Sequence, residues 1–182
     1  MCAGARGFCP RSWGAGVTGL PSNYRGQGFS LIGDKNRFVL PTDFRGAVRA
    51  ASGNQRVLCL DKHHKFRCLV GFGLARSDSF AAMIDREEGK AIALGQDYDR
   101  DERSGQLYAF DEAGFDESGR FILAESLAEQ AGVTNALYFH GGGEFFTIWA
   151  PDMLFAMGDG WDGAKAKCRA HMAEAAARSK RK

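Results

Sequence analysis

The stretch Lys35-Asn36-Arg37-Phe38-Val39-Leu40-Pro41-Thr42-Asp43-Phe44 returns 83 positions later as Ser118-Gly119-Arg120-Phe121-Ile122-Leu123-Ala124-Glu125-Ser126-Leu127. A second block follows each copy at an offset of 79, in which Leu58-Cys59-Leu60, Phe66, Leu69 and Val70 match Leu137-Tyr138-Phe139, Phe145, Ile148 and Trp149 without an internal gap. A repeat of this length predicts two copies of one supersecondary unit that face each other. Each copy places one arginine at the same turn, so the duplicated element is a candidate binding loop.

Each copy predicts the order β-turn-β-α-β-β-α. In the first copy we expect strands at 28–32, 38–40, 57–60 and 66–72, a helix capped by Thr42, and a second helix from about Ser77, capped by its hydroxyl, to about Arg86. A charged, flexible link is expected over 97–105. The second copy predicts a helix at 125–131 ended by Gly132, a hairpin at 136–150 turning on 141–143, and two later helices, one opened by Pro151 and one over 164–178. The fold class is therefore α+β, mainly β.

The charge of the chain is unevenly distributed, although its formal net value is only +2. Residues 165–182 carry seven basic residues against one acid, and 35–67 carry eight basic residues, whereas 68–164 have a net charge of −12. Clustered basic charge is typical of polyanion binding, while solvated surface is the alternative reading. The longest apolar runs are far shorter than the roughly 20 residues of a membrane span, so no membrane partner is expected.

The five cysteines are scattered and contain no CxxC pair, which favours a reducing cytoplasm over a secreted disulfide framework. Residues 1–23 are rich in Gly, Ala and Cys and make a poor signal peptide. We interpret them as a disordered or non-native N-terminal extension. The repeats then predict a first unit at 24–95 and a second at 96–163, followed by a basic C-terminal helix and tail at 164–182.

Three motifs in this order resemble the MraZ family: Tyr24-Arg25-Gly26, then Asp34-Lys35-Asn36-Arg37-Phe38-Val39-Leu40-Pro41, then Asp116-Glu117-Ser118-Gly119-Arg120. The family begins with Phe-Arg-Gly and carries an Asp-x-x-x-Arg motif in each of two repeats. The second motif is complete here, whereas Gly33 stands at the first motif's Asp and Asn36 stands at the usual Gly. The resemblance spans about residues 24–155 and indicates a somewhat divergent member.

The resemblance implies two tandem AbrB-like swapped-hairpin repeats that form a pseudo-dimeric barrel with peripheral helices. It also implies a sequence-specific DNA-binding transcriptional regulator that acts as a ring-like homo-oligomer. Such proteins bind direct repeats in double-stranded DNA upstream of division and cell-wall genes and associate with the nucleoid.

By the same resemblance, Lys35, Arg37, Arg120 and Arg45 would contact DNA, while Asp34, Asp116 and Gly119 would shape the loops. A turn that projects Lys and Arg reaches phosphates, and Arg reads a guanine edge with two hydrogen bonds. The alternative for each arginine is an exposed turn residue, and Arg45 and Arg49 also suit surface ion pairs. Duplication at matched turns favours the binding role for Arg37 and Arg120.

Two weaker motifs point to other chemistry. Cys59-x3-His63-His64-x3-Cys68 has the residue types of a zinc site. The repeat, however, places His63-His64 on the turn of the matching hairpin, so that Cys59 and Cys68 would be buried cross-strand partners. His140-Gly141-Gly142-Gly143 resembles an oxyanion-hole run, but the chain has no G-x-S-x-G nucleophile elbow. We therefore expect no metal, no cofactor and no enzyme.

An alternative function remains open beside the DNA-binding reading. The Gly33 departure and the acidic stretch 68–164 also fit an oligomeric protein-interaction module with weakened DNA binding. Salt-sensitive DNA affinity would favour the regulator, because each phosphate neutralised releases counterions. Intact oligomers with unmeasurable DNA affinity would favour the interaction module.

Overall fold

The computed structural model of the chain describes residues 23–179. Within this range the strands are β1 (Gln27–Leu31), β2 (Arg37–Val39), β3 (Val57–Lys62), β4 (Leu69–Phe72), β5 (Asp111–Gly114), β6 (Arg120–Ile122), β7 (Ala136–Gly141) and β8 (Phe146–Trp149). The α-helices are α1 (Thr42–Ala51), α2 (Phe80–Ala93), α3 (Arg100–Tyr108), α4 (Glu125–Ala131), α5 (Pro151–Phe155) and α6 (Asp162–Ser179), and the 3-10 turns are η1 (Asp34–Asn36), η2 (Leu74–Ser79) and η3 (Asp159–Trp161). The α+β class is as expected, whereas the expectation of a mainly β chain is wrong, because the α-helices contain more residues than the strands. Residues 1–22 of the expected extension and the last three residues of the basic tail lie outside the described range.

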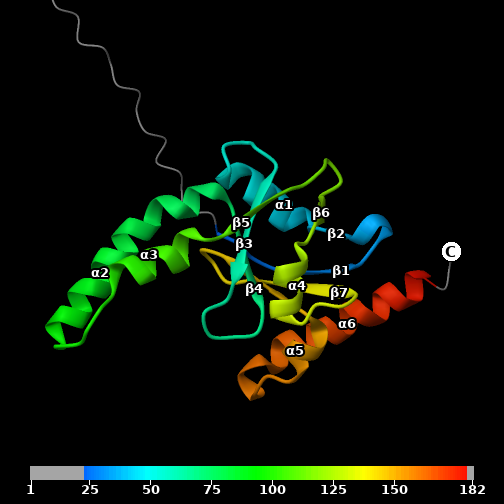
Figure 1. Ribbon diagram of the computed structural model, residues 1–182. Helices are drawn as coiled ribbons and strands as arrows, with labels where there is room; N and C mark the ends of the chain where they lie inside the picture. Colours follow the sequence, from blue (N-terminus) through cyan, green and yellow to red (C-terminus); the bar gives the residue numbers. More distant parts are fainter. Residues whose placement is uncertain (1–22, 180–182) are drawn as a thin grey trace, which may run out of the picture.

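Six strands form one antiparallel sheet in the order β1-β7-β8-β4-β3-β5, and β2 pairs with β6 in a separate ribbon (Figure 1). The outer strands cross between the two halves of the chain, because β1 pairs with β7 and β5 pairs with β3. Each copy's first strand therefore extends the hairpin that belongs to the other copy. Among the described strands the sheet is not closed, since β1 and β5 form its two ends.

The strand registers reveal an approximate two-fold relation between the copies. In the ribbon, Phe38 faces Phe121, which is its own counterpart at the offset of 83. In the sheet, Val70 faces Thr147, with Gly71 opposite Phe146 on one side of that pair. In each case the two paired strands come from different copies and are related by a two-fold axis near the central pair. Equivalent side chains of the two strands therefore point to the same side and pack into one core.

The same registers correct the alignment of the second block. Lys62 pairs with Leu69, whereas Gly141 pairs with Phe146, so the first hairpin has the longer turn. Residues of β4 therefore correspond to those of β8 at an offset of 77, and the ungapped offset of 79 is wrong beyond the turn. Hydrophobic side chains recur at short spacing in both strands, so the ungapped alignment matched Leu69 to Ile148 although the two are not equivalent.

The main core lies between the sheet, the ribbon and the short helices α1 and α4. Phe146 is fully buried at its centre, with ring centroids 4.7 Å from Phe44 of α1 and 5.1 Å from Tyr24. A second cluster beneath α5 and α6 contains the buried side chains of Cys68, Tyr138, Trp149, Leu154, Ala164 and Cys168. Together these clusters hold both copies as one packed body.

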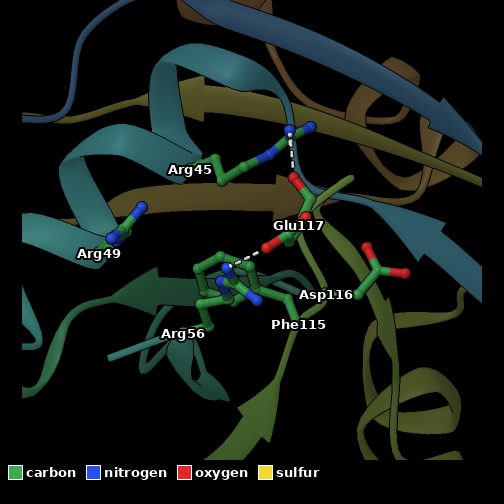
Figure 2. Close-up of a pocket in the computed structure, with 6 residues that line it drawn as sticks. All are labelled: Arg45, Arg49, Arg56, Phe115, Asp116 and Glu117. Carbon is green, nitrogen blue, oxygen red and sulfur yellow. Dashed lines mark hydrogen bonds and ion pairs between the residues drawn. The ribbon is translucent and has the colours of Figure 1, made fainter. Parts of the chain in front are cut away.

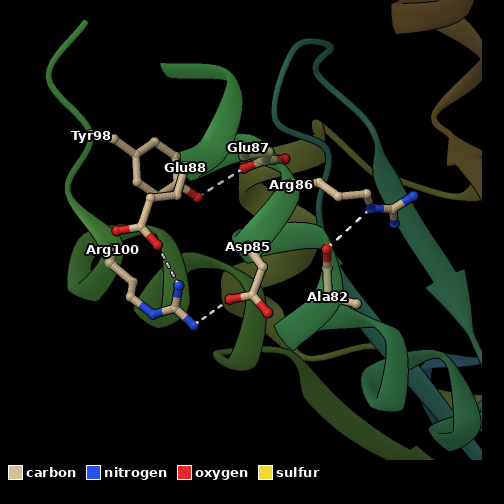
Figure 3. A network of polar contacts seen from close by, with 7 residues as sticks. All are labelled: Ala82, Asp85, Arg86, Glu87, Glu88, Tyr98 and Arg100. Atoms are coloured by element: carbon tan, nitrogen blue, oxygen red, sulfur yellow. Dashed lines mark hydrogen bonds and ion pairs between the residues drawn. The ribbon is translucent and has the colours of Figure 1, made fainter. Parts of the chain in front are cut away.

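The expected flexible link over 97–105 is wrong, because most of it is helical. Asp99 caps α3 by accepting a hydrogen bond from the Glu102 N–H at 2.9 Å. Figure 3 shows Arg100 of α3 between two acids of α2, with its guanidinium 2.7 Å from Asp85 and 2.6 Å from Glu88. The helices α2 and α3 lie side by side and project from the sheet (Figure 1).

Two helix starts differ from the prediction, and one helix also runs past its expected end. In α1 the N-cap is Pro41 rather than Thr42, which is the first helical residue. Helix α2 begins at Phe80 and runs beyond the expected end, while the Ser77 hydroxyl donates to the Leu74 carbonyl at 2.7 Å and caps nothing. The end of α4 is confirmed, because Gly132 adopts φ 67° in the left-handed region that glycine favours.

Candidate nucleic-acid interface

The ribbon of β2 and β6 has a buried face and an exposed face, because side chains alternate along a strand. Phe38 and Phe121 lie on the buried face, with ring centroids 6.3 Å apart. The exposed face carries two arginines and two aliphatic residues, which are Arg37, Val39, Arg120 and Ile122. The two copies thus present equivalent arginines on one small surface around the two-fold axis.

The aliphatic residues on this surface are unusually open to solvent. Val39 is 40% exposed and Ile122 is 58% exposed, although both belong to types that are usually buried. Apolar side chains beside arginines are able to contact thymine methyl groups while the arginines bind phosphates or guanine edges. The face therefore offers charge and apolar contact together.

The loop between β5 and β6, residues Asp116–Arg120, is closed by its own backbone and by one carboxylate. The Asp116 N–H donates to the Arg120 carbonyl at 3.0 Å, and the Gly119 N–H donates to the Asp116 carbonyl at 2.9 Å. The Asp116 carboxylate accepts from the Arg120 N–H at 2.9 Å. Gly119 adopts φ 81°, a conformation that residues with a Cβ rarely adopt. We call this segment loop 2.

The charge of Asp116 is favoured by its surroundings. The hydrogen bond from the Arg120 N–H lowers the pKa of this carboxyl most, and the nearby charges of Arg120 and Arg37 lower it further. The Asp116 carboxylate and the Arg120 Nε are 3.9 Å apart and exposed, so this ion pair leaves the guanidinium accessible. Asp116 therefore fixes the backbone of loop 2 without occupying the arginine head group.

The matching loop between β1 and β2, residues Gly33–Arg37, has the same backbone closure and lacks the carboxylate. The Gly33 N–H donates to the Arg37 carbonyl at 2.8 Å, just as the Asp116 N–H donates to the Arg120 carbonyl in loop 2. Lys35 and Asn36 adopt φ 59° and 55°, so two residues with side chains lie in the left-handed region. The exposed Asp34 makes no side-chain hydrogen bond within residues 23–179. We call this segment loop 1.

Gly33→Asp is expected to stabilise the protein more than Gly33→Ala does. The new carboxylate would accept from the Arg37 N–H, and such hydrogen bonds contribute about 0.5–1.5 kcal/mol. A Cβ at Gly33 meets only the Arg37 carbonyl oxygen, at an ordinary 3.5 Å, so both variants fit the extended backbone. Both variants also lose glycine's freedom in the unfolded chain, which makes alanine the matched control. Denaturant unfolding of the two proteins measures the difference, and equal stabilities would contradict the proposed role of an aspartate here.

Arg45 lies beneath loop 2 rather than on the open ribbon face. Its guanidinium donates from Nη1 to the Glu117 carbonyl at 3.1 Å and from Nη2 to the Leu40 carbonyl at 3.2 Å. The Glu117 side chain binds Arg56, with 2.7 Å between Nη2 and Oε1. Glu117 is thus held through its backbone by one arginine and through its carboxylate by another.

Three arginines and loop 2 line a shallow cavity of about 200 Å³ (Figure 2). Figure 2 shows Arg45 reaching from α1 toward Glu117, while Arg49 lies one turn further along the helix. The sequence comparison missed Arg56, which enters the site through Glu117. Its counterpart at the offset of 79 is Asn135, so the repeat gave no signal for this arginine.

The structure changes the reading of the Cys-His run. Cys59 faces Phe72, and the His63 N–H donates to the Cys68 carbonyl, so the expected pairing of Cys59 with Cys68 is wrong. The His63 Nδ1 accepts from the backbone N–H groups of Lys65 and Phe66, at 3.0 and 3.2 Å, and thereby closes the turn. Residues 23–179 contain no group of three His, Cys, Asp or Glu side chains placed to hold a metal ion.

The glycine run lies in the turn between β7 and β8, as expected. The Gly142 N–H donates to the Phe145 carbonyl at 3.0 Å. Gly143 exchanges backbone hydrogen bonds with Tyr24 at 2.7 and 3.1 Å, so this turn also holds the first described segment of the chain. None of the helices in residues 23–179 is both long and apolar enough to cross a membrane.

No family model matches the chain. A protein named transcriptional regulator MraZ from Parvibaculum lavamentivorans is 32% identical over 138 residues, which cover 71% of this chain and 77% of that protein. The chain belongs to the MraZ family. Proteins of the same name from Gluconacetobacter diazotrophicus and Rhodospirillum rubrum are each 30% identical, over 64% and 67% of this chain and 72% and 76% of their own lengths.

This chain is a divergent member of the MraZ family, and the two loops of the site show how its two motifs differ. Its second motif is complete and forms a loop with a carboxylate hydrogen bond. Its first motif has Gly33 at the position of Asp116 and Asn36 at the position of Gly119. The two loops are therefore alike in backbone pairing and unlike in the side chains that hold them.

Proposed function

We propose that this MraZ-family protein is a DNA-binding transcriptional regulator whose ribbon face contacts double-stranded DNA. The observation that supports it most is the pair of equivalent arginines, Arg37 and Arg120, on one exposed surface. Lys35 extends the positive charge of that surface from loop 1. A DNA-binding protein needs such repeated cationic groups because phosphate contacts supply most of the non-specific affinity.

The proposed fold is the AbrB-like swapped hairpin, with one hairpin from each copy. The exchange of β1 and β5 between the two halves supports this assignment. A swapped arrangement brings loops from distant parts of the chain to one surface, where they act as a pair. We propose the domain limits 24–95 and 96–163 on the same basis, with 164–182 as an addition.

We further propose that the protein works as a homo-oligomer on direct repeats upstream of division and cell-wall genes, in the cytoplasm and at the nucleoid. Two loops per chain make few DNA contacts, so joined copies would raise the effective concentration at neighbouring sites. The projecting helix pair offers a surface for self-association, because Ile92 and Leu94 near the end of α2 are 71% and 70% exposed. Isolated exposed residues of this size are normal, so their role rests on the oligomer proposal.

The test is binding of the purified protein to DNA from its own upstream promoter region, beside a scrambled sequence, at low and moderate salt. The proposal expects preference for the promoter DNA and weaker binding of both DNAs as salt rises. A folded, oligomeric protein that ignores both DNAs would overturn the regulator proposal. That outcome would favour the protein-interaction module, for which the acidic segment 68–164 supplies the charge asymmetry.

A further inference from the structure

The contact between Arg45 and Gly119 is unusually close. Gly119 is buried, and a Cβ built on it would lie 2.7 Å from both Cζ and Nη2 of Arg45. The guanidinium packs on this glycine while it donates to the carbonyls of Glu117 and Leu40. One side chain of α1 therefore ties loop 2 to the residue that follows β2.

At the positions that correspond to Arg45 and Gly119, the other copy has a small residue on the helix and a residue with a side chain in loop 1. Arg45 corresponds to Ala128 of α4, since their N–H groups make the same first-turn bonds, to Pro41 at 2.9 Å and to Ala124 at 3.0 Å. Gly119 corresponds to Asn36, which is exposed and carries a Cβ. A Cβ in the loop excludes a packed guanidinium, and a packed guanidinium excludes a Cβ. Gly119 therefore leaves room for Arg45, and Ala128 leaves room for the side chain of Asn36.

Loop 2 is thus held by two side chains that loop 1 lacks. Within the loop, the Asp116 carboxylate accepts a hydrogen bond from the backbone of Arg120, and from α1 the Arg45 guanidinium donates one to the carbonyl of Glu117. Loop 1 has Gly33 and Ala128 at the corresponding positions. A loop already fixed in its bound shape loses less conformational entropy on binding, and it discriminates better because misplaced partners are not accommodated.

We propose that Arg45 is a positioning residue that holds loop 2 for sequence discrimination, while loop 1 contributes mainly charge. This inference rests on the proposed DNA-binding function. It differs from a direct role of Arg45 in contacting DNA, because Nη1 and Nη2 each donate to a backbone carbonyl and the Nε is buried within the described residues. The two roles predict different responses to DNA sequence and to salt.

Arg45→Ala is expected to weaken binding to the promoter DNA by about tenfold or more, since hydrogen bonds to charged groups are lost from loop 2. Binding to scrambled DNA should change much less, so the ratio of the two affinities falls. The slope of log affinity against log salt should stay as in the wild type. A lost phosphate contact would instead reduce that slope by about 0.9 and weaken both DNAs alike, which would overturn the positioning role.

Arg49→Ala is the matched control, because Arg49 is exposed on the same helix and lines the same cavity. It removes one positive charge without removing a side-chain hydrogen bond seen within residues 23–179, so the affinity ratio should not change. Arg45→Lys gives a second, milder test. A lysine keeps the charge but lacks the planar fork that reaches two carbonyls, so the ratio should still fall.

A measurement without DNA separates this inference from the proposed function. In Arg45→Ala the amide hydrogens of Gly119 and Arg120 should exchange faster with solvent, while that of Gly33 in loop 1 keeps its wild-type rate. Unchanged exchange in loop 2 would overturn the inference even if the wild type discriminates between DNAs. If the wild type ignores DNA, the proposed function fails, and the exchange rates alone decide whether Arg45 holds loop 2.

Discussion

Replacing Arg37 and Arg120 together by alanine is expected to reduce affinity for promoter DNA roughly thirtyfold or more. Each side chain lies on the outer face of the ribbon, and an arginine that contacts a phosphate or a guanine edge typically contributes about 1–3 kcal/mol. The salt dependence reports the kind of contact, since each lost phosphate contact lowers the slope by about 0.9. Titrations of promoter and scrambled DNA at several salt concentrations measure both quantities.

The fold should tolerate this double change, because neither side chain belongs to the buried core. Its thermal unfolding should remain close to that of the wild type, as for most surface substitutions. Arg86→Ala is a suitable control for charge alone, since Arg86 is exposed on α2 of the projecting helix pair. If the double variant binds promoter DNA as tightly as Arg86→Ala does, the ribbon face is not the DNA-binding surface.

The single variants connect this prediction to the two loops. Arg120→Ala should reduce discrimination more than Arg37→Ala, because loop 2 is held by Asp116 and Arg45 whereas loop 1 is not. Arg37→Ala should weaken both DNAs to similar extents. The difference follows from how each arginine is presented, since the two occupy equivalent positions in the ribbon register.

The repeat in the sequence predicted two copies of one unit that face each other with arginines at matched positions. The ribbon agrees with this prediction, because Phe38 pairs with its own counterpart Phe121. The sequence also predicted the end of α4 at Gly132, because glycine readily adopts the left-handed conformation that ends a helix. Local rules of this kind depend on a few neighbouring residues.

The errors in the sequence analysis share a physical cause. The segment 97–105 was expected to be flexible because it is highly charged, yet Arg100 and Arg103 pair with acids on α2 and stabilise a helix. Such pairing depends on a second helix that lies elsewhere in the sequence. The hairpin offset failed for a similar reason, since only the strand pairing shows that Leu69 corresponds to Phe146 rather than to Ile148.

Arg45 shows what the sequence could not predict at the site itself. Its match to the family motif predicts a DNA contact, which stays a prediction, whereas its bonds to the carbonyls of Glu117 and Leu40 are visible only in the structure. The contact to Glu117 spans 72 positions of the sequence. A glycine in loop 2 and an arginine in α1 were both visible in the sequence, but their dependence on each other appears only when the two halves are packed together.

Phe146→Ala is expected to destabilise the protein by about 3–5 kcal/mol, as large aromatic truncations in a core do. Phe146 is fully buried and contacts rings from the N-terminal segment, α1 and β7, with centroids 5.1, 4.7 and 6.2 Å from Tyr24, Phe44 and Phe139. For a domain of this size the thermal midpoint should fall by roughly 6–20 °C at a fixed protein concentration. Ile122→Ala on the exposed face of β6 should change it little.

Gly71, which faces Phe146 in the pairing of β4 with β8, provides a second test of this packing. A Cβ on Gly71 would lie 2.5 Å from the Phe146 ring, so Gly71→Ala alone should cost about 1–3 kcal/mol through overpacking. In the Phe146→Ala background the same methyl group enters the vacated space, and its cost should vanish or change sign. Denaturant unfolding of the four proteins in this cycle measures the coupling. If Phe146→Ala does not fold, Phe146→Leu replaces it and should show the same sign, whereas additive effects would mean that the ring does not fill the space left by the glycine.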